Sequence, residues 1–201
     1  MDTESPLRER LIDAGVELVL SEGPGALGLR EIARRAGVSH GAPRRHFPTH
    51  QALLSAIARR GFADLVTRFE VAAPTGAGPR EQVRALGAAY VAHAVERPGM
   101  FELMFRHDLL DSGDGEPDAG PRLRESTLPL LGTFVALVAR CGVPDPEVTA
   151  AALWANLHGV AQLWGRGSLP LALGGGTAED LTRLVDAAVT AHLGPPAGGP
   201  A

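Results

Sequence analysis

Apolar residues recur along most of the chain at the spacing of one face of an α-helix. The first segment shows this at intervals of four, three and four residues, with Leu7, Leu11, Ala14 and Leu18. Such intervals place side chains on one side of a helix. Ser5 followed by Pro6 is a typical start signal, an N-cap residue before a proline at the first helical position. The Gly-Pro-Gly run at residues 23–25 ends this predicted helix.

The same periodicity predicts further helices in the rest of the chain. They cover residues 29–36, 40–46, 49–69, 80–97, 99–107, 122–140, 147–166 and 178–192. No segment alternates with period two and is rich in β-branched residues, so strands are not expected. The uncharged stretch 148–165 contains Asn156 and His158, which favours a helix buried in protein over a membrane span. The prediction is an all-α fold of about nine helices.

Composition narrows the class of protein. The chain has 201 residues and a single cysteine, Cys141, which excludes an intrachain disulfide and a cysteine-rich zinc site. We therefore expect a reducing, cytoplasmic setting. The N-terminus lacks the apolar run of a secretory signal. Residues 108–121 carry five acids and are interpreted as a solvated connector, with a cation site as the alternative, and residues 194–201 as a disordered tail.

The charge is distributed unevenly along the sequence. The formal net charge is −4, which by itself argues against a nucleic-acid partner. Residues 28–60, however, hold seven arginines and one acid, a net of +6, and the remaining chain carries −10. All 19 basic residues are arginine. A local basic surface on an acidic body is typical of a DNA-binding protein, with a solvated helical face as the alternative.

Two short predicted helices within this basic segment meet at a sharp turn. Gly37 supplies the backbone freedom that a turn after a helix needs. Ala33 is small where two helices must cross closely, and Ile32, Val38 and Pro43 supply apolar contacts for the crossing. This spacing is that of a helix-turn-helix.

The sequence around this turn, IARRAGVSHGAPRRHFPTHQALL at residues 32–54, resembles the TetR-type (tetracycline-repressor-like) family of bacterial regulators. The resemblance covers about residues 6–57. It implies a three-helix DNA-binding domain at residues 1–50, a connecting helix at 50–70, and a ligand-binding and dimerisation domain at 71–193. It also implies a ligand-responsive repressor acting as a homodimer on a palindromic operator. The alternatives are an activator of the same fold and a helical dimerisation or ligand-binding module without DNA binding.

A second likeness lies further along the chain. Trp154 and the His158-Gly159 pair, with residues 98–105 upstream, are similar to the TetR subgroup whose C-terminal domain is named for Trp, His and Gly. This likeness covers roughly residues 87–164.

The resemblance implies that the third helix, expected at residues 40–46 with Ser39 as its N-cap, enters the major groove of double-stranded DNA. The residues expected to contact DNA are Arg30, Ser39, His40, Gly41, Arg44, Arg45, His46 and His50. Arg44 stands where the family favours Tyr, and His50 where it favours Lys. Pro43 replaces a usual Leu and removes one helical N–H, so an irregular start of this helix is expected. Phe47 is expected in the core.

Met and aromatic residues of the second half can line an adaptable pocket for a small hydrophobic or amphipathic effector. The candidates are Met100, Phe101, Met104, Phe105, Phe134, Leu157, His158 and Trp164, for which ordinary core packing is the alternative. We expect a homodimer formed through the last two predicted helices, since one recognition helix reads too few base pairs.

An enzyme is not expected. The chain has no phosphate-binding glycine loop, no HExxH and no Gly-x-Ser-x-Gly. No catalytic residue, metal or cofactor is therefore assigned, and no membrane association is expected.

Overall fold

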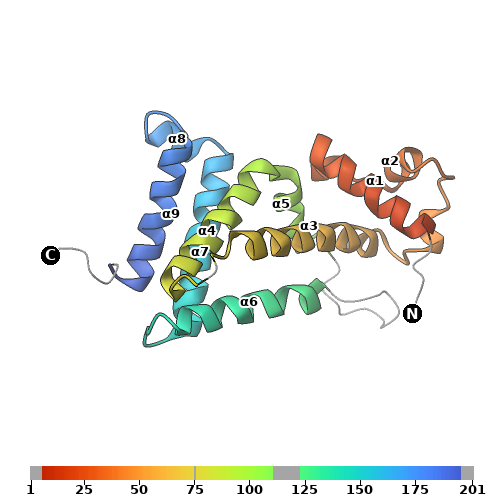
Figure 1. The fold of residues 1–201 in the computed structure, drawn as a ribbon. Coiled ribbons are helices and arrows are strands. Elements are labelled where there is room, and N and C mark those ends of the chain that lie inside the picture. The colour runs from red at the N-terminus through yellow and green to blue at the C-terminus, as the bar shows by residue number, and fades with distance from the viewer. Residues whose placement is uncertain (1–5, 75, 111–122, 196–201) are drawn as a thin grey trace. The chain divides into compact units, whose positions relative to one another are not determined.

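The structure is a computed structural model that describes residues 6–74, 76–110 and 123–195. Every regular element in those ranges is helical (Figure 1), which confirms the all-α prediction and its nine helices. The elements are α1 (Pro6–Glu22), η1 (Pro24–Ala26), α2 (Leu29–Arg35), η2 (Pro43–Arg45), α3 (His50–Ala72), α4 (Pro79–Glu96), α5 (Pro98–Met104), α6 (Leu123–Ala139), α7 (Pro146–Gly165), α8 (Ser168–Ala172) and α9 (Ala178–Leu193). Here η marks a short 3₁₀ helix.

Some sequence predictions concern residues outside these described ranges. The N-cap at Ser5, most of the acidic connector (residues 111–121) and the end of the tail (residues 196–201) lie outside the described residues. Within the described residues, no helix combines the length and apolar character needed to cross a bilayer.

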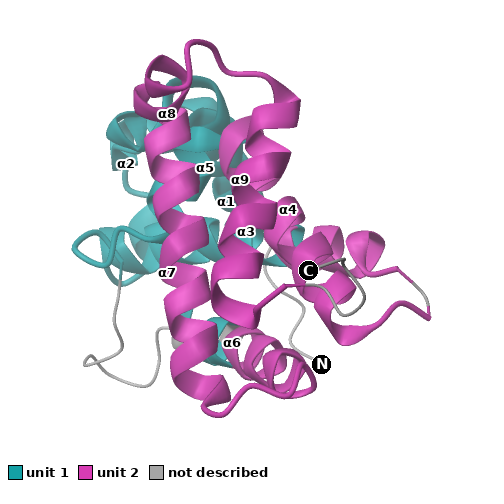
Figure 2. Cartoon of the chain, turned by 90° about the vertical axis from the view of Figure 1, so that its left-hand side faces the viewer, with its two compact units in different colours: residues 1–64, 97–128 teal, residues 65–96, 129–201 magenta. Residues whose placement is uncertain are grey.

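The chain divides into two compact units (Figure 2). Unit 1 comprises Met1–Asp64 and Arg97–Leu128. In it, α1 packs against both α2 and α5. The side chains with no exposed surface in this unit are apolar and come from α1, α2, α3 and α5: Leu11, Leu18, Ile32, Ala33, Leu53, Ile57, Ala58, Leu103 and Met104. The periodic apolar positions of the sequence therefore form the core that holds the helix-turn-helix.

Unit 2 comprises Leu65–Glu96 and Pro129–Ala201. Helices α4, α7 and α9 pack against one another in all three pairings. Arg84 of α4 and Asp186 of α9 form an ion pair at 2.6 Å, and a capping box between Thr177 and Asp180 begins α9. Helix α8 was not predicted, because five residues are too few to show a period.

Helix α7 differs from its prediction in burial. The uncharged stretch is helical, but only one of its faces is buried. Val148, Trp154 and Leu163 are 64%, 40% and 46% exposed. Helix α7 therefore leaves apolar side chains exposed to solvent.

Candidate nucleic-acid interface

The predicted turn after α2 is a Schellman motif, the hydrogen-bond pattern that commonly ends a helix. The amide of Val38 donates to the carbonyl of Ala33 at 3.0 Å, and that of Gly37 to the carbonyl of Arg34 at 3.1 Å. Gly37 has φ of +67°, a left-handed conformation that favours glycine. Ile32 and Ala33 are fully buried beneath the turn, as the helix-turn-helix pattern predicts.

The recognition segment, which we define as residues 38–47, is not the regular helix that the sequence predicts. The prediction of an α-helix over residues 40–46 is wrong: the segment contains the 3₁₀ turn Pro43–Arg45, preceded by another turn in which Ala42 N donates to Ser39 O at 2.9 Å. The cause is Pro43, which has no N–H to give to that carbonyl. The irregular start expected from this proline extends through the whole segment.

The predicted N-cap at Ser39 is also wrong. Within the described residues the Ser39 hydroxyl has no hydrogen bond. An N-cap hydroxyl would accept from the amide of Ala42, but that amide donates to the main-chain carbonyl of Ser39 instead. Thr49, by contrast, caps α3 as predicted, since its Oγ1 accepts from the amide of Ala52 at 3.0 Å. Phe47 is buried, also as expected.

Most residues expected to contact DNA are exposed. His46 is half-buried, and the others are open to solvent: Arg30, Ser39, His40, Gly41, Arg44, Arg45 and His50. The exposed His50 is nevertheless bound through its ring to a main-chain carbonyl of the loop before α2. The local structure thus presents this set at the surface of one small region of unit 1.

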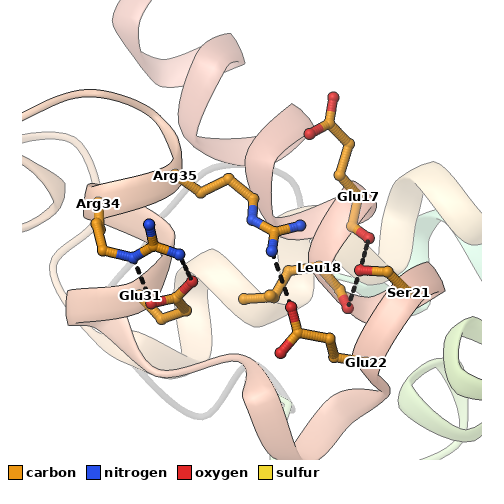
Figure 3. Close-up of polar contacts among 7 residues, drawn as sticks. All are labelled: Glu17, Leu18, Ser21, Glu22, Glu31, Arg34 and Arg35. Carbon is orange, nitrogen blue, oxygen red and sulfur yellow. Dashed lines mark hydrogen bonds and ion pairs between the residues drawn. The ribbon is translucent and has the colours of Figure 1, made fainter.

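Six of the seven arginines of the basic segment divide into two groups. Arg34 and Arg35 are held by Glu31 and Glu22 (Figure 3), at 2.5 Å and 2.8 Å. Arg34 donates to both oxygens of Glu31, and this bond keeps the pKa of that carboxyl below its ordinary value. Arg60 is paired with Glu9.

Arg30, Arg44 and Arg45 form the second group. Among the residues that the structure describes, none of these three has an ion pair or a side-chain hydrogen bond. Their guanidinium groups therefore need not break an internal pair in order to meet a phosphate or a guanine edge.

Two family models match the chain. One, described as "Bacterial regulatory proteins, tetR family", matches residues 11–57, which include the turn and the recognition segment. The other, "Tetracyclin repressor-like, C-terminal domain", matches residues 83–192, more than half of the chain. The chain belongs to the TetR family. This is a family of DNA-binding transcriptional regulators and not of enzymes, as the sequence predicted.

Individual relatives agree with this assignment. The TetR-family chain is 27% identical over 133 residues to the HTH-type transcriptional activator FasR of Mycolicibacterium smegmatis, a match of 66% of this chain but only 59% of FasR. A solved protein of unknown function from Rhodococcus sp. RHA1 is 28% identical, with a TM-score of 0.72 over 96% of both chains. The regulator FadR from Bacillus subtilis, solved in complex with stearoyl-CoA, has a TM-score of 0.65 at 14% identity, over 93% of this chain and 98% of FadR, and shows the fold alone.

The residues expected to bind an effector fall into two sets. Met100, Phe101, Met104 and Phe105 belong to unit 1, where the sulfur atoms of both methionines lie against Gly61 of α3. A Cβ atom at Gly61 would be 2.7 Å from the Met104 sulfur, so only glycine lets them pack this closely. Phe105 contacts the rings of Phe101 and Phe62, with centroids 4.9 Å and 5.7 Å apart. These four side chains form one packed cluster.

Leu157, His158, Trp164 and Phe134 belong to unit 2. Leu157 is buried over Gly87 of α4, and Trp164 lies beside Gly176, next to α8. Phe134 is half-buried on α6. The ring of His158 is hydrogen-bonded to Tyr90 of α4 at 2.8 Å.

Tyr90 is a polar residue that the sequence reasoning did not consider. Trp154 Nε1 donates to its hydroxyl at 3.1 Å, and the hydroxyl is hydrogen-bonded to Nδ1 of His158 at 2.8 Å. Burial lowers the pKa of His158 and raises that of Tyr90. Tyr90 is the only tyrosine of the sequence and lies in an alanine-rich helix. Because a buried tyrosine hydroxyl needs a hydrogen-bond partner, its position in the sequence could have indicated a polar contact here.

Proposed function

We propose that this TetR-family chain is a ligand-responsive repressor that binds a palindromic operator as a homodimer. The observation that carries the proposal is the group of three arginines, Arg30, Arg44 and Arg45, which are exposed beside a helix-turn-helix and have no ion pair or side-chain hydrogen bond with any described residue. Residues 1–50 form the DNA-binding domain in this proposal, α3 connects it onward, and residues 71–193 form the effector and dimerisation domain. A DNA operator places this function in the cytoplasm.

In the proposed complex the recognition segment enters the major groove. Ser39, His40 and Gly41 stand at its exposed start, where a hydroxyl, an imidazole and a bare main chain can approach phosphates and base edges. Arg44 and Arg45 offer planar donor pairs that match a guanine edge or a phosphate. In this complex His46 and His50 lie beside the sugar-phosphate backbone of the DNA. The absence of lysine favours directional contacts over diffuse attraction.

Dimerisation is proposed through α7 and α9. Val148 and Leu163 lie on one side of α7 and form the centre of this surface, and α9 packs directly against α7 within unit 2. Two such pairs related by a two-fold axis bury their apolar faces as a four-helix arrangement. A two-fold dimer also carries two recognition segments, as a palindrome requires.

The proposed effector is hydrophobic or amphipathic. The Met and aromatic cluster around Met104 supplies polarisable, adaptable side chains. The pair Trp154 and His158, with Gly159, supports membership in the subgroup named for Trp, His and Gly. Stearoyl-CoA, which the Bacillus subtilis FadR structure contains, is a suitable first compound to test. FasR is an activator, which keeps activation as the second candidate function.

Selection of duplexes from a randomised pool tests the proposal. Wild-type protein should enrich an inverted repeat, and its affinity for that duplex should fall steeply with salt. Transcription in vitro from a promoter carrying the enriched site should decrease with protein and recover with effector. An increase in transcription would establish the activator instead, and failure to enrich any sequence would reject the proposed operator function.

A further inference from the structure

Two arginines of α1 hold the two ends of the recognition segment, although neither lies in the basic stretch 28–60. The first is Arg10. Its Nη2 donates to the main-chain carbonyl of Ala36 at 2.6 Å, across 26 residues of sequence. Ala36 is the C-cap of α2 and comes directly before the left-handed Gly37. Arg10 therefore fixes the point at which the chain leaves α2 and turns into the recognition segment.

The second arginine is Arg8. Its guanidinium carbon lies 5.2 Å from the centroid of the Phe47 ring, within the range of a cation–π contact. Phe47 is the last residue of the recognition segment and is buried. The side chain of Arg8 is itself only 19% exposed, so its position is fixed by packing as well as by charge.

The geometry of α1 explains how one helix reaches both ends. Residues two apart on a helix point to nearly opposite sides, because each residue turns by about 100°. Arg8 and Arg10 therefore diverge, one toward Phe47 and the other toward Ala36. Both belong to unit 1, as does the whole recognition segment.

The recognition segment needs external support because it lacks a regular hydrogen-bond ladder. Pro43 interrupts it, and its main chain is held by short turns within residues 39–47. A regular recognition helix is stiffened by its own bonds, whereas single turns in water are marginal. Contacts at the two ends supply the restraint that the segment's own backbone lacks.

We propose that Arg8 and Arg10 are positioning residues for sequence-specific DNA recognition, and that they restrain the recognition segment in its binding conformation. The inference rests on the proposed role of that segment. A loosened segment would still attract phosphates through Arg44 and Arg45 but would place their donors less accurately on base edges. Loss of either α1 contact should therefore reduce selectivity more than it reduces non-specific binding.

The test compares a duplex enriched by wild-type protein with a random duplex of the same length. Arg8→Gln and Arg10→Gln should each lower the ratio of the two affinities by about fivefold or more, from a specific preference of roughly 10³ or higher. Arg140→Gln removes the same charge from an exposed position directly after α6, outside the proposed DNA and dimer surfaces, and serves as the matched control. Affinity for the random duplex should change no more than it does in this control.

Hydrogen exchange gives a second readout. Amides of residues 38–47 should exchange faster in the two variants, while their melting temperatures stay close to that of wild type. Arg10→Lys keeps a cationic donor and should recover part of the selectivity. It also provides a folded comparison if a glutamine variant is unstable.

Three results would overturn the inference. Unchanged selectivity in Arg8→Gln and Arg10→Gln would reject the positioning role and leave the proposed function intact. Equal weakening toward both duplexes would show that the two arginines are direct phosphate contacts. If wild-type protein enriches no duplex, the proposed operator function fails, and the positioning role fails with it.

Discussion

Nε2 of His50 lies 2.6 Å from the carbonyl oxygen of Leu27. His50 is the first residue of α3, and Leu27 is buried in the loop before α2. Since a carbonyl only accepts, Nε2 carries the proton, and a neutral ring then has a lone pair rather than a donor at Nδ1. The family's usual lysine would instead place a permanent charge here. In this chain the position joins two parts of unit 1.

We expect His50→Ala to lower the free energy of unfolding by about 1 kcal/mol, the cost of losing one such hydrogen bond. Urea unfolding measures it, and Gln51→Ala, at the exposed neighbouring position of the same helix, is the control. DNA affinity should fall less than in Arg44→Ala. A variant as stable as wild type that binds DNA tenfold more weakly would show instead that His50 is a phosphate ligand.

Arg44→Ala should reduce affinity for the enriched duplex by about tenfold or more, the effect of losing a contact worth roughly 1–3 kcal/mol. Arg34→Ala removes an equal charge, but Arg34 is already held by Glu31, so a smaller loss is expected. Fluorescence anisotropy titrations at several salt concentrations measure both. Equal losses in the two variants would contradict the division of the arginines into paired and available groups.

Gly61→Ala should destabilise the protein by about 1–3 kcal/mol, because the added methyl group overlaps the sulfur atoms of Met100 and Met104. Gly132→Ala is the matched control: it also lies within a helix, but nothing occupies the space around it. That substitution should raise stability by about 0.5–1 kcal/mol. Thermal and urea unfolding distinguish the two, and equal effects would mean that the methionines yield easily.

The His158 pair makes stability depend on pH. Burial lowers the folded-state pKa of His158 below its ordinary value near 6.5, so the unfolded chain takes up this proton first as pH falls. The stability that neutral His158 contributes is therefore present above about pH 6.5 and is lost as pH falls toward the lower folded pKa.

His158→Gln should remove that part of the pH dependence in urea unfolding between neutral and mildly acidic pH. His107→Gln removes an exposed histidine from unit 1 and is the control. If the free energy of unfolding changes with pH equally in wild type and in His158→Gln, the His158 ring is not held neutral as inferred.

Leu163→Glu should shift the dimer toward monomer at micromolar concentration, because it places a charge at the centre of the proposed interface. Val71→Glu changes a residue that is 83% exposed and lies on α3, outside that interface, and should leave the dimer unaffected. Light scattering and sedimentation measure the assembly state. A monomeric wild-type protein would contradict the interface outright.

Local features were predictable from sequence. Gly37 sits where the turn needs a left-handed residue, and Thr49 begins its helix as a cap, because both depend on neighbouring residues alone. The helix at 40–46 failed for a reason that was visible in the sequence. Pro43 has no amide to donate to the carbonyl of Ser39, and the irregularity that it causes extends through the whole segment instead of its start alone.

The remaining contacts join residues that are distant in sequence. Arg10 donates to a main-chain carbonyl that is 26 residues away in the sequence. Because every residue has such a carbonyl, no sequence pattern identifies Ala36 as the partner. The net charge of +6 belongs to the residues of the basic segment alone. Acids of α1, among them Glu22 and Glu9, neutralise part of that charge from outside the segment.

The bond between Trp154 and Tyr90 also gives the protein a built-in optical probe. The chain has only two tryptophans, and Trp164 is half-buried beside Gly176. Trp154 is 40% exposed on α7, one of the two helices of the proposed dimer surface. Burial of an indole in an apolar interface shifts its emission to shorter wavelength. Intrinsic fluorescence can therefore follow subunit exchange and effector binding in the unlabelled protein, with Trp154→Phe identifying the signal.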